Sequence, residues 1–416
     1  MRILFVNYMA TSLPTMIRSF ELARAVAMRG HDVVLAFMNP AFRPPDWFRA
    51  HLEAARGTRL DLRLPPEPAA RPGAAAPGEA GRVTDARPSA LGLLRQAAGS
   101  MRYVAAERAL YAEARPDVVV ARPDQVFSFV RSSRSARIPL VLDTDGPVEE
   151  LDHYWGIRSR GFRGLDAWRA RRAAALLHIS RVTGDLWRSK RIPEERLFPC
   201  PNGADPEVFR PAGDEARRAT RRALGLDGKR VVGFSGNQRA WHGVGDLLRA
   251  MAPRFAQDPD LRLLLIGSIE DRGALRLDDL PPRVIEERVV FTGAVPYAAM
   301  PRHLDAADLL VLPYPALPLF HFSPMKLFEA LAMAKPIVAS RQGQIGDLLD
   351  GLSSARLYDP AVPGALAAAI DAGLALPAGA GAASRGFLEG AHTWAHRGAQ
   401  VEAACHAAAG RGRGGA

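Results

Sequence analysis

Cysteines, lysines and long apolar runs are scarce in this sequence of 416 residues. The two cysteines, Cys200 and Cys405, lie far apart, so they form neither a disulfide framework nor a metal-binding spacing. A reducing compartment fits this usage best. No stretch approaches 18 uninterrupted apolar residues, and the opening run Met1–Tyr8 fits a first β-strand better than a signal peptide. We therefore expect a cytoplasmic protein without a spanning helix.

Lysine occurs only at positions 190, 229, 326 and 335, so 55 − 4 = 51 of the basic residues are arginine. This preference, together with abundant alanine, glycine and proline, indicates GC-rich coding, so part of the net charge of +11 is compositional. The alternative is attraction to phosphates, acidic lipid or nucleic acid. Because the arginines scatter along the chain and no recognisable nucleic-acid module occurs, we expect no nucleic-acid partner.

Strand and helix patterns alternate throughout, which predicts an α/β fold with parallel sheets covered on both faces. The first series ends before a polar connector at Asp205–Asp214, so we place a domain boundary near residue 208. Two doubly wound domains of similar size would face a central cleft, where ligands bind beyond the carboxyl ends of the strands. The Pro/Ala/Gly-rich segment Pro65–Pro88 is predicted to be a surface excursion. The predicted strands are Ile3–Asn7, Asp32–Phe37, Asp117–Ala121, Pro139–Leu142, Arg230–Ser235, Leu261–Ile266, Val289–Thr292, Leu309–Leu312 and Pro336–Ala339.

A glycine-rich segment, Gly233–Gly243, follows one predicted strand and precedes a predicted helix at Val244–Met251. Glycines let backbone N–H groups approach a ligand closely, and a helix N-terminus favours an anion. Arg239 and His242 could add cationic hydrogen bonds to a phosphate. The alternative is an ordinary turn whose glycines serve packing, since the segment is neither a Walker loop nor G-x-G-x-x-G.

A second segment, Ser323–Ala339, has Pro324 at a predicted helix start and both Lys326 and Glu329 on one helix face. The lysine could hold a diphosphate, and the carboxylate could accept the hydroxyls of a ribose. The alternative is a surface Lys–Glu pair of small energetic weight. A third and weaker segment, Val290–Pro296, ends in an extended Val295-Pro296 whose backbone could cap a nucleobase.

Together these segments resemble the retaining GT-B glycosyltransferases of family 4, also called group-1 glycosyltransferases. The resemblance extends to the N-terminal run Thr15–Val33, to His178–Ser180, to Pro201–Asp205 and to Asp308–Tyr314. It implies a sugar-binding domain at 208–386, an acceptor-side domain at 1–207 and a helix at 387–409 that crosses back to the first domain. The Trp-His-Gly loop and the Ser-Pro-x-Lys helix start are similar to a subgroup of this family.

The resemblance implies transfer of a sugar from a nucleoside diphosphate sugar to an acceptor hydroxyl with retention of configuration, in polysaccharide or glycolipid assembly. Three departures from the family pattern stand out: His321 replaces the first Glu of a Glu-x7-Glu motif, Asn237 and His242 replace an Arg and a Lys, and Asp143–Glu150 stands where the family has a histidine. The residues expected to stabilise charge or to orient the acceptor are His242, Lys326 and Asp145. The residues expected to bind the donor are Gly236, Asn237, Arg239, Val295, His321, Ser323, Pro324, Met325 and Glu329.

No cofactor or metal is expected, because no His/Cys/Asp set has ligand spacing. The expected partners are a nucleotide sugar and an acceptor that is a glycan, a lipid-linked glycan or a small molecule. The basic and aromatic segment Tyr154–Arg172 could meet the inner face of a membrane; the alternative is a solvated arginine-rich helix with inward aromatics. Two other functions stay open: a GT-B-fold binding protein without catalysis, and a sugar-nucleotide epimerase or phosphorylase of the same architecture.

Overall fold

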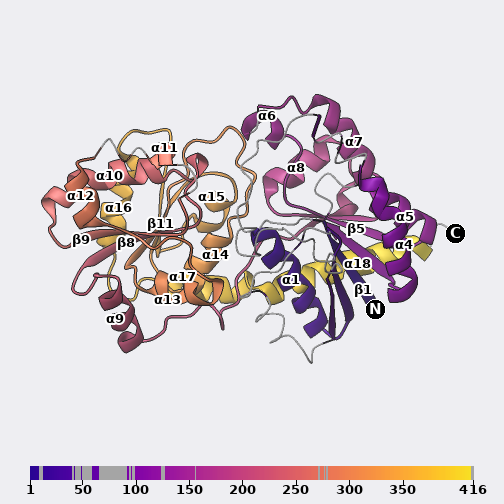
Figure 1. Cartoon of the computed structure of the whole chain (residues 1–416), viewed down its shortest axis with the longest axis horizontal. Coiled ribbons are helices and arrows are strands. Elements are labelled where there is room, and N and C mark those ends of the chain that lie inside the picture. The colour runs from indigo at the N-terminus through magenta and orange to yellow at the C-terminus, as the bar shows by residue number, and fades with distance from the viewer. Residues whose placement is uncertain are drawn as a thin grey trace, which may run out of the picture. The chain divides into compact units, whose positions relative to one another are not determined.

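The structure, a computed structural model, has two compact units: Met1–Pro201 with Trp394–Ala416, and Asn202–Thr393. Each unit is a parallel β-sheet with helices packed on it (Figure 1). The structure describes residues 1–8, 13–39, 42, 48, 59–64, 91–92, 95, 99–122, 127–154, 156–269, 272–275, 277 and 280–413. The predicted surface excursion at Pro65–Pro88 lies outside these residues.

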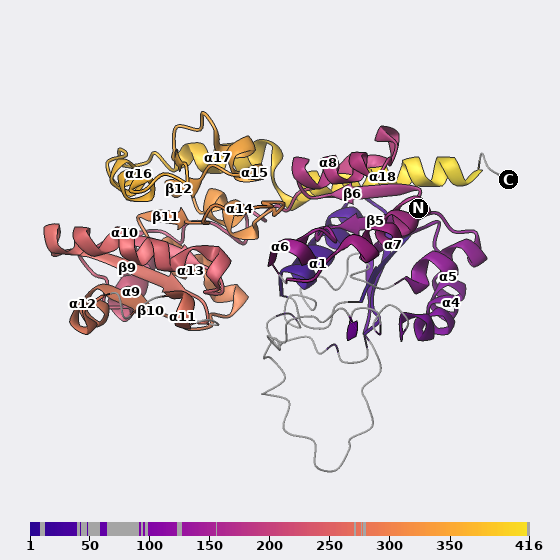
Figure 2. The same cartoon turned by 90° about the horizontal axis from the view of Figure 1, so that it is seen from above.

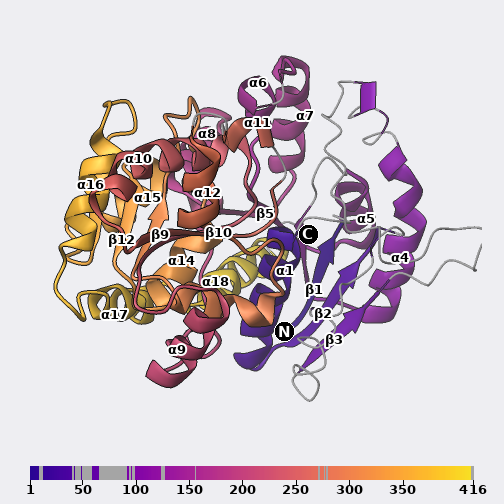
Figure 3. The same ribbon diagram turned by 60° about the vertical axis from the view of Figure 1, so that its left-hand side comes forward.

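The sheet of the first unit has the strand order β3-β2-β1-β4-β5-β6-β7 among the described residues, and all its pairs are parallel. Strands β1, β2 and β3 are seen side by side in Figure 3. Most strand residues are buried, as a parallel sheet covered on both faces requires. The strands are β1 (Arg2–Asn7), β2 (Asp32–Phe37), β3 (Leu60–Arg63), β4 (Val118–Arg122), β5 (Leu140–Thr144), β6 (Ala175–His178) and β7 (Leu197–Pro199).

One face of this sheet packs on a cluster that includes side chains of α4, α5 and α8, with Trp187 almost fully buried. The last helix, α18, packs along α1 and runs past β6 (Figures 1 and 2). The helices are α1 (Leu13–Met28), α4 (Tyr103–Ala114), α5 (Ser128–Ala136), α6 (Glu150–Tyr154), α7 (Arg160–Ala170), α8 (Arg181–Ser189) and α18 (Trp394–Arg413).

The sheet of the second unit has the order β10-β9-β8-β11-β12-β13. Its strands are β8 (Arg230–Ser235), β9 (Leu261–Ile266), β10 (Val289–Phe291), β11 (Leu309–Leu312), β12 (Ile337–Ser340) and β13 (Ala355–Tyr358). Its helices are α9 (Asp214–Ala223), α10 (Val244–Gln257), α11 (Arg272–Leu275), α12 (Pro282–Arg288), α13 (Met300–Asp305), α14 (Met325–Ala332), α15 (Gly343–Leu349), α16 (Ala365–Leu374) and α17 (Ala382–Ala391). Apolar side chains of α10 and of strands β8, β9 and β11 form the largest part of its core.

The prediction of two parallel, doubly wound α/β domains is confirmed, and the predicted strands fall within one or two residues of the observed ones. The units divide at 201/202 and 393/394, whereas the sequence placed the boundaries at 207/208 and 386/387. Residues 387–391 belong to α17 of the second unit, and α18 begins only at Trp394. Strands β3 (Leu60–Arg63), β6, β7 and β13 were not predicted.

The close crossing of α18 over α1 depends on Gly398. A Cβ there would lie 2.8 Å from Ala25 Cβ and 3.1 Å from the Ala25 carbonyl oxygen. Because backbone atoms cannot move aside easily, we expect Gly398→Val to destabilise the protein by about 1–3 kcal/mol. Gly410→Val on the same helix is the control, since nothing lies within 4 Å of a Cβ there. Thermal unfolding checks this, and equal melting temperatures for the two variants would contradict it.

Candidate functional site

The predicted donor-binding residues gather at the carboxyl ends of β8 and β11 in the second unit. Strands β8 and β11 are neighbours although β9 and β10 lie between them in sequence, so the strand order reverses here. Loops that follow strands on either side of such a reversal diverge and leave room for a ligand. Gly236 directly follows β8, and Tyr314 comes two residues after β11.

The glycine segment is held against the neighbouring loops by its backbone. Gly236 N donates to Ile266 O at 2.8 Å, and Gln238 N donates to Ser268 O at 3.0 Å. Gly243 has φ +69°, and a Cβ there would lie 1.7 Å from the Pro313 carbonyl oxygen. No other residue fits this position without moving the loop. At least this glycine therefore serves close packing, as the alternative interpretation of the segment proposed.

Hydrogen bonds from a residue outside α14 fix the segment that leads into this helix. Pro324 occupies the N-cap position in extended conformation, so it lies one residue before the helix and not in its first turn. Asn202 N donates to Ser323 Oγ at 2.9 Å, and Asn202 Nδ2 donates to Ser323 O at 2.6 Å. These two bonds orient the segment that leads into Met325 and Lys326.

The Lys326 side chain is half-buried, but its Nζ atom has no exposed surface and no hydrogen-bond partner among the described residues. Nζ lies 4.4 Å from the centre of the Phe234 ring and 5.5 Å from that of Tyr314. Both distances suit a cation–π contact. A Cβ on Gly236 would lie 2.6 Å from Nζ, so only glycine leaves room for the amine.

Lys326 and Glu329 interact electrostatically but share no hydrogen bond. Burial lowers the pKa of Lys326 to about 7, although the Glu329 carboxylate opposes this. Burial likewise raises the pKa of Glu329 to about 7, partly opposed by Lys326. The alternative of a solvated surface pair does not fit, because the Lys326 amine is withdrawn from water, which costs free energy.

His242 lies beside Lys326, in the short 3-10 helix Ala240–His242 before α10. Its Nδ1 bonds to the Asn237 carbonyl oxygen. Because a carbonyl only accepts, Nδ1 must carry the proton, and Nε2 of the neutral ring is then an acceptor. Burial, and next the Lys326 charge, lower the pKa of His242 well below its usual value. His242 is thus not a ready-made cation in the ligand-free protein.

The remaining predicted donor-binding residues differ in their exposure and in their contacts. Asn237 is exposed, and the Arg239 guanidinium stacks on Trp241 with its carbon 5.1 Å from the ring centre. His321 is buried with its ring 4.2 Å from that of Phe322. Val295 is half-buried in the loop after β10.

Asp145, the predicted acceptor-side residue, belongs to an arginine–aspartate network at the strand ends of the first unit. Arg122 Nη2 bonds to Asp145, whose side chain is 33% exposed, and to Thr15 Oγ1 at 3.1 Å. Arg122 also pairs with Asp143 at 3.3 Å, and Arg18 Nη2 pairs with Asp143 at 2.6 Å. Although burial opposes it, Arg18 and Arg122 hold the pKa of Asp143 below its usual value.

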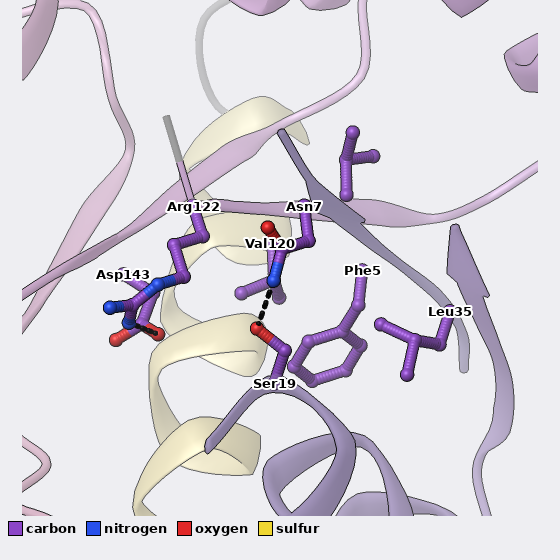
Figure 4. Close-up of a pocket in the computed structure, with 8 residues that line it drawn as sticks. Phe5, Asn7, Ser19, Leu35, Val120, Arg122 and Asp143 are labelled. Carbon is purple, nitrogen blue, oxygen red and sulfur yellow. Dashed lines mark hydrogen bonds and ion pairs between the residues drawn. The ribbon is translucent and has the colours of Figure 1, made fainter. Parts of the chain in front are cut away.

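Figure 4 shows Arg122 beside Asp143 and the hydrogen bond from Asn7 to Ser19, at a cavity of about 10 Å³. This volume holds roughly one water molecule. The first two carboxylates of the acidic turn, Asp143 and Asp145, are therefore paired with arginines. Asp143 is buried and paired with two arginines, whereas Asp145 and Glu150 are partly exposed.

Four residues of these sites were not singled out from the sequence: Phe234, Tyr314, Arg18 and Arg122. In the sequence, Phe234 looks like an ordinary strand residue and Tyr314 like an ordinary loop residue. No periodicity distinguishes them from their neighbours. A buried arginine is a usable signal only when its carboxylate partner is known, and here Asp143 lies 125 residues from Arg18 and 21 from Arg122.

One group in the described part of the chain brings three metal-type ligands together: His31, Glu402 and His406 of the first unit. Glu402 Oε1 bonds to His31 at 2.6 Å, and Arg29 Nε donates to Glu402 Oε2 at 2.8 Å. The guanidinium already neutralises the carboxylate, and its charge disfavours a divalent cation nearby. These residues explain how α18 is anchored, and they do not form a donor set that favours a metal.

The basic and aromatic segment is partly neutralised. Arg163 pairs with Asp152 at 2.9 Å, and Arg169 is buried against Asp166 at 2.7 Å. Trp168 is 37% exposed, and the Arg172 guanidinium stacks on its ring at 4.2 Å. Trp155 lies outside the described residues. The aromatics are thus not all inward, and α7 presents arginines and one tryptophan at its surface. Of the helices in the described ranges, none combines the length and apolar character that a bilayer crossing needs.

Residues 229–375 match the family described as glycosyl transferases group 1. The D-inositol 3-phosphate glycosyltransferase of Corynebacterium glutamicum (strain R) is 29% identical over 185 residues, which are 41% of this chain and 43% of that protein. The alpha-D-kanosaminyltransferase of Streptomyces kanamyceticus is 26% identical over 226 residues, 52% of this chain and 56% of that protein. The chain thus spans about half the length of the curated relatives it matches.

Among solved structures, HepE of Anabaena in complex with UDP and glucose superposes with a TM-score of 0.70 and 18% sequence identity. The match covers 97% of this chain and 98% of that one. It establishes the fold as GT-B, built from two Rossmann-like domains, as the sequence predicted.

The buried amine predicts a pH-dependent stability. We expect Lys326→Met to stabilise the ligand-free protein by about 1–3 kcal/mol at pH 6, because it removes a buried polar group without a partner. The folded-state pKa of Lys326 is about 7 against an ordinary 10.5, so between these values the unfolded wild type binds more protons. Wild-type stability therefore rises with pH in this window, and the advantage of the variant should shrink.

Urea unfolding of both proteins at pH 6 and pH 9 measures this difference. Lys229→Met is the matched control, since Lys229 pairs with Asp260 at the surface. A stabilisation by Lys326→Met that is identical at both pH values would show that burial does not shift the titration of this lysine.

Proposed function

We propose that this chain, whose residues 229–375 carry a domain of the group 1 glycosyltransferase family, transfers a sugar from a nucleoside diphosphate sugar to an acceptor hydroxyl with retention of configuration. The observation that carries the proposal is the buried Lys326 amine at the start of α14. This amine has no hydrogen-bond partner among the described residues, and Glu329 follows it one turn later in the same helix. The complex of HepE with UDP and glucose supports a uridine nucleotide as the first donor to try.

The chemistry requires stabilisation of negative charge on the leaving diphosphate. We expect Lys326 Nζ and the first N–H groups of α14 to interact with that charge, which grows in the transition state. His242 would add a donor at Nε2 only in its protonated form, which burial and the Lys326 charge disfavour. Glu329 accepts hydrogen bonds from the ribose hydroxyls. No metal or cofactor takes part in this proposal.

The acceptor is assigned to the first unit, where Asp145 orients its hydroxyl. Because Arg122 holds Asp145 in place, the carboxylate has one fixed direction instead of several rotamers. The relative named D-inositol 3-phosphate glycosyltransferase supports a polar acceptor, and polysaccharide or glycolipid assembly is the proposed setting.

A donor-binding assay tests the role of Glu329. In a thermal-shift panel of nucleotide sugars, the bound donor raises the melting temperature by mass action. Glu329→Ala should weaken its binding by about 1–3 kcal/mol, because ribose hydroxyls lose their acceptor. The exposed Glu286 on α12 gives the control variant Glu286→Ala. Unchanged affinity in a folded Glu329→Ala protein removes this residue from the donor site.

Turnover of the donor separates the other functions from this one. Product analysis with and without acceptor distinguishes a transferase from an epimerase, which converts the donor alone, and from a phosphorylase, which requires phosphate. Donor binding without any turnover would favour the non-catalytic binding protein.

We further propose that the protein works at the cytoplasmic face of a membrane, with α7 on anionic lipid and a lipid-linked glycan as acceptor. The exposed Trp168 and the exposed Arg171 and Arg172 support this orientation. Each arginine near an anionic surface contributes about 1 kcal/mol.

Co-sedimentation with anionic and neutral liposomes measures the attachment. Changing both Arg171 and Arg172 to Gln should reduce anionic binding at least tenfold, since about 2 kcal/mol is lost. The control changes Arg218 and Arg222 of α9 to Gln, which removes the same charge from another helix. Equal, negligible binding to both liposomes, with full activity on a water-soluble acceptor, would contradict membrane docking.

A further inference from the structure

Lys326 differs from the other lysines of this chain in what surrounds its amine. The other three each have a carboxylate oxygen within 3.1 Å, whereas Nζ of Lys326 has no acceptor at all among the described residues. The pairs are Lys190 with Glu149 and Asp166, Lys229 with Asp260, and Lys335 with Asp305. Buried polar groups without a partner are rare in native proteins, and a missing ligand is one explanation for them.

Two aromatic rings and glycine backbone contact this amine, and no described residue accepts a hydrogen bond from it. Phe234 at the end of β8 and Tyr314 after β11 present ring faces to Nζ, and Gly236 presents backbone without a side chain. The rings attract a cation weakly but offer no oxygen to accept its hydrogen bonds. Tyr314 in turn packs edge-on against Phe320 at 5.1 Å and against His242 at 5.8 Å, so its ring is held from both sides.

We propose that Phe234 and Tyr314 are positioning residues that keep Lys326 without an anion until a nucleotide-sugar diphosphate binds, so that donor binding takes up a proton. The inference rests on the proposed function and adds a specific property to it. The step is an association of the neutral amine, one proton and the donor to give an ammonium–diphosphate contact, and no covalent bond to carbon forms or breaks.

The charged and titratable groups around Lys326 are few, and each acts in a known direction. Glu329 on the same helix favours the ammonium, but it lies too far to donate or accept a hydrogen bond with Nζ. From the glycine segment, His242 is neutral, because burial and then Lys326 lower its pKa. The Arg239 guanidinium stacks on Trp241, and the Tyr314 hydroxyl stays protonated because burial raises its pKa. None of these groups neutralises the amine.

The direction of the pH effect follows from the two states of the lysine. In the ligand-free protein its pKa is about 7, because burial disfavours the ammonium. Two phosphate charges at hydrogen-bond distance raise the pKa in the complex. Between these two values the complex holds one proton more than the free partners, so the donor affinity should fall about tenfold for each pH unit. Below pH 7 the contribution of Lys326 should level off, because the amine is then protonated in both states.

Isothermal titration calorimetry on the full chain tests this, with the nucleotide sugar that gives the largest thermal shift. A nucleotide sugar is preferred to a nucleoside diphosphate, because a terminal phosphate itself titrates near pH 6. Titrations at pH 6, 7, 8 and 9, in buffers of different ionisation heat, give the affinity and the number of protons taken up. We expect about one proton at pH 8 and an affinity about fiftyfold lower at pH 9 than at pH 7, because the free amine is already half deprotonated at pH 7.

Substitutions of the two ring residues test whether they control the protonation of Lys326 or only fill space. Tyr314→Leu and Phe234→Leu remove a ring and admit water to Nζ, so the lysine should be protonated before binding, and both the proton uptake and the slope above pH 7 should vanish. Tyr314→Phe keeps the ring and should keep the slope. His242→Gln should also keep it, which assigns the proton to Lys326 and not to the histidine.

A proton uptake of zero at pH 8, or an affinity that is flat from pH 7 to 9 in the wild type, would overturn the inference while the donor site stands. The same holds if Tyr314→Leu retains the full slope, or if His242→Gln abolishes it. Failure of every nucleotide sugar to bind at any pH would instead overturn the proposed function, and the inference with it.

Discussion

The candidate site of the second unit depends on one unfavourable placement, a buried lysine amine without a hydrogen-bond partner among the described residues. Its position follows from the strand order, because β8 and β11 are neighbours and the segments that follow them meet at the amine. Gly236 leaves space for Nζ, and Gly243 lets the loop approach Pro313. A site that keeps an unpaired charge gives up stability for function, as active sites commonly do.

In the first unit, by contrast, buried charged side chains at the strand ends are paired with one another. Arg18 and Arg122 are each within hydrogen-bond distance of Asp143, and Arg122 also holds Asp145. Buried ions that are paired in this way cost less than isolated ones, and they fix one another in a single geometry. The same residue types, a basic group and a carboxylate at strand ends, thus give a rigid framework in one unit and an unpaired amine in the other.

Much of the fold was predictable because buried parallel strands are short runs of β-branched and leucine residues between helix-length segments. Strands Arg230–Ser235, Leu261–Ile266 and Leu309–Leu312 were assigned with their observed bounds. The domain limits were less accurate, because connectors such as Asn202–Asp214 carry no periodicity. In the candidate site, Lys326 and Glu329 were identified from their spacing, whereas their burial was not, since spacing on a helix does not reveal what covers its face.

The sequence by itself determined two α/β domains, the glycine segment, and a lysine and a glutamate on one face of a helix, because these are local properties of pattern and spacing. Only the tertiary structure decided that the lysine is unpaired. That property depends on Phe234 and Tyr314, which lie 92 and 12 residues from Lys326 and come from two different strand ends. The charge state of an amine is set by the atoms within a few ångströms of it, and the fold alone determines which atoms those are.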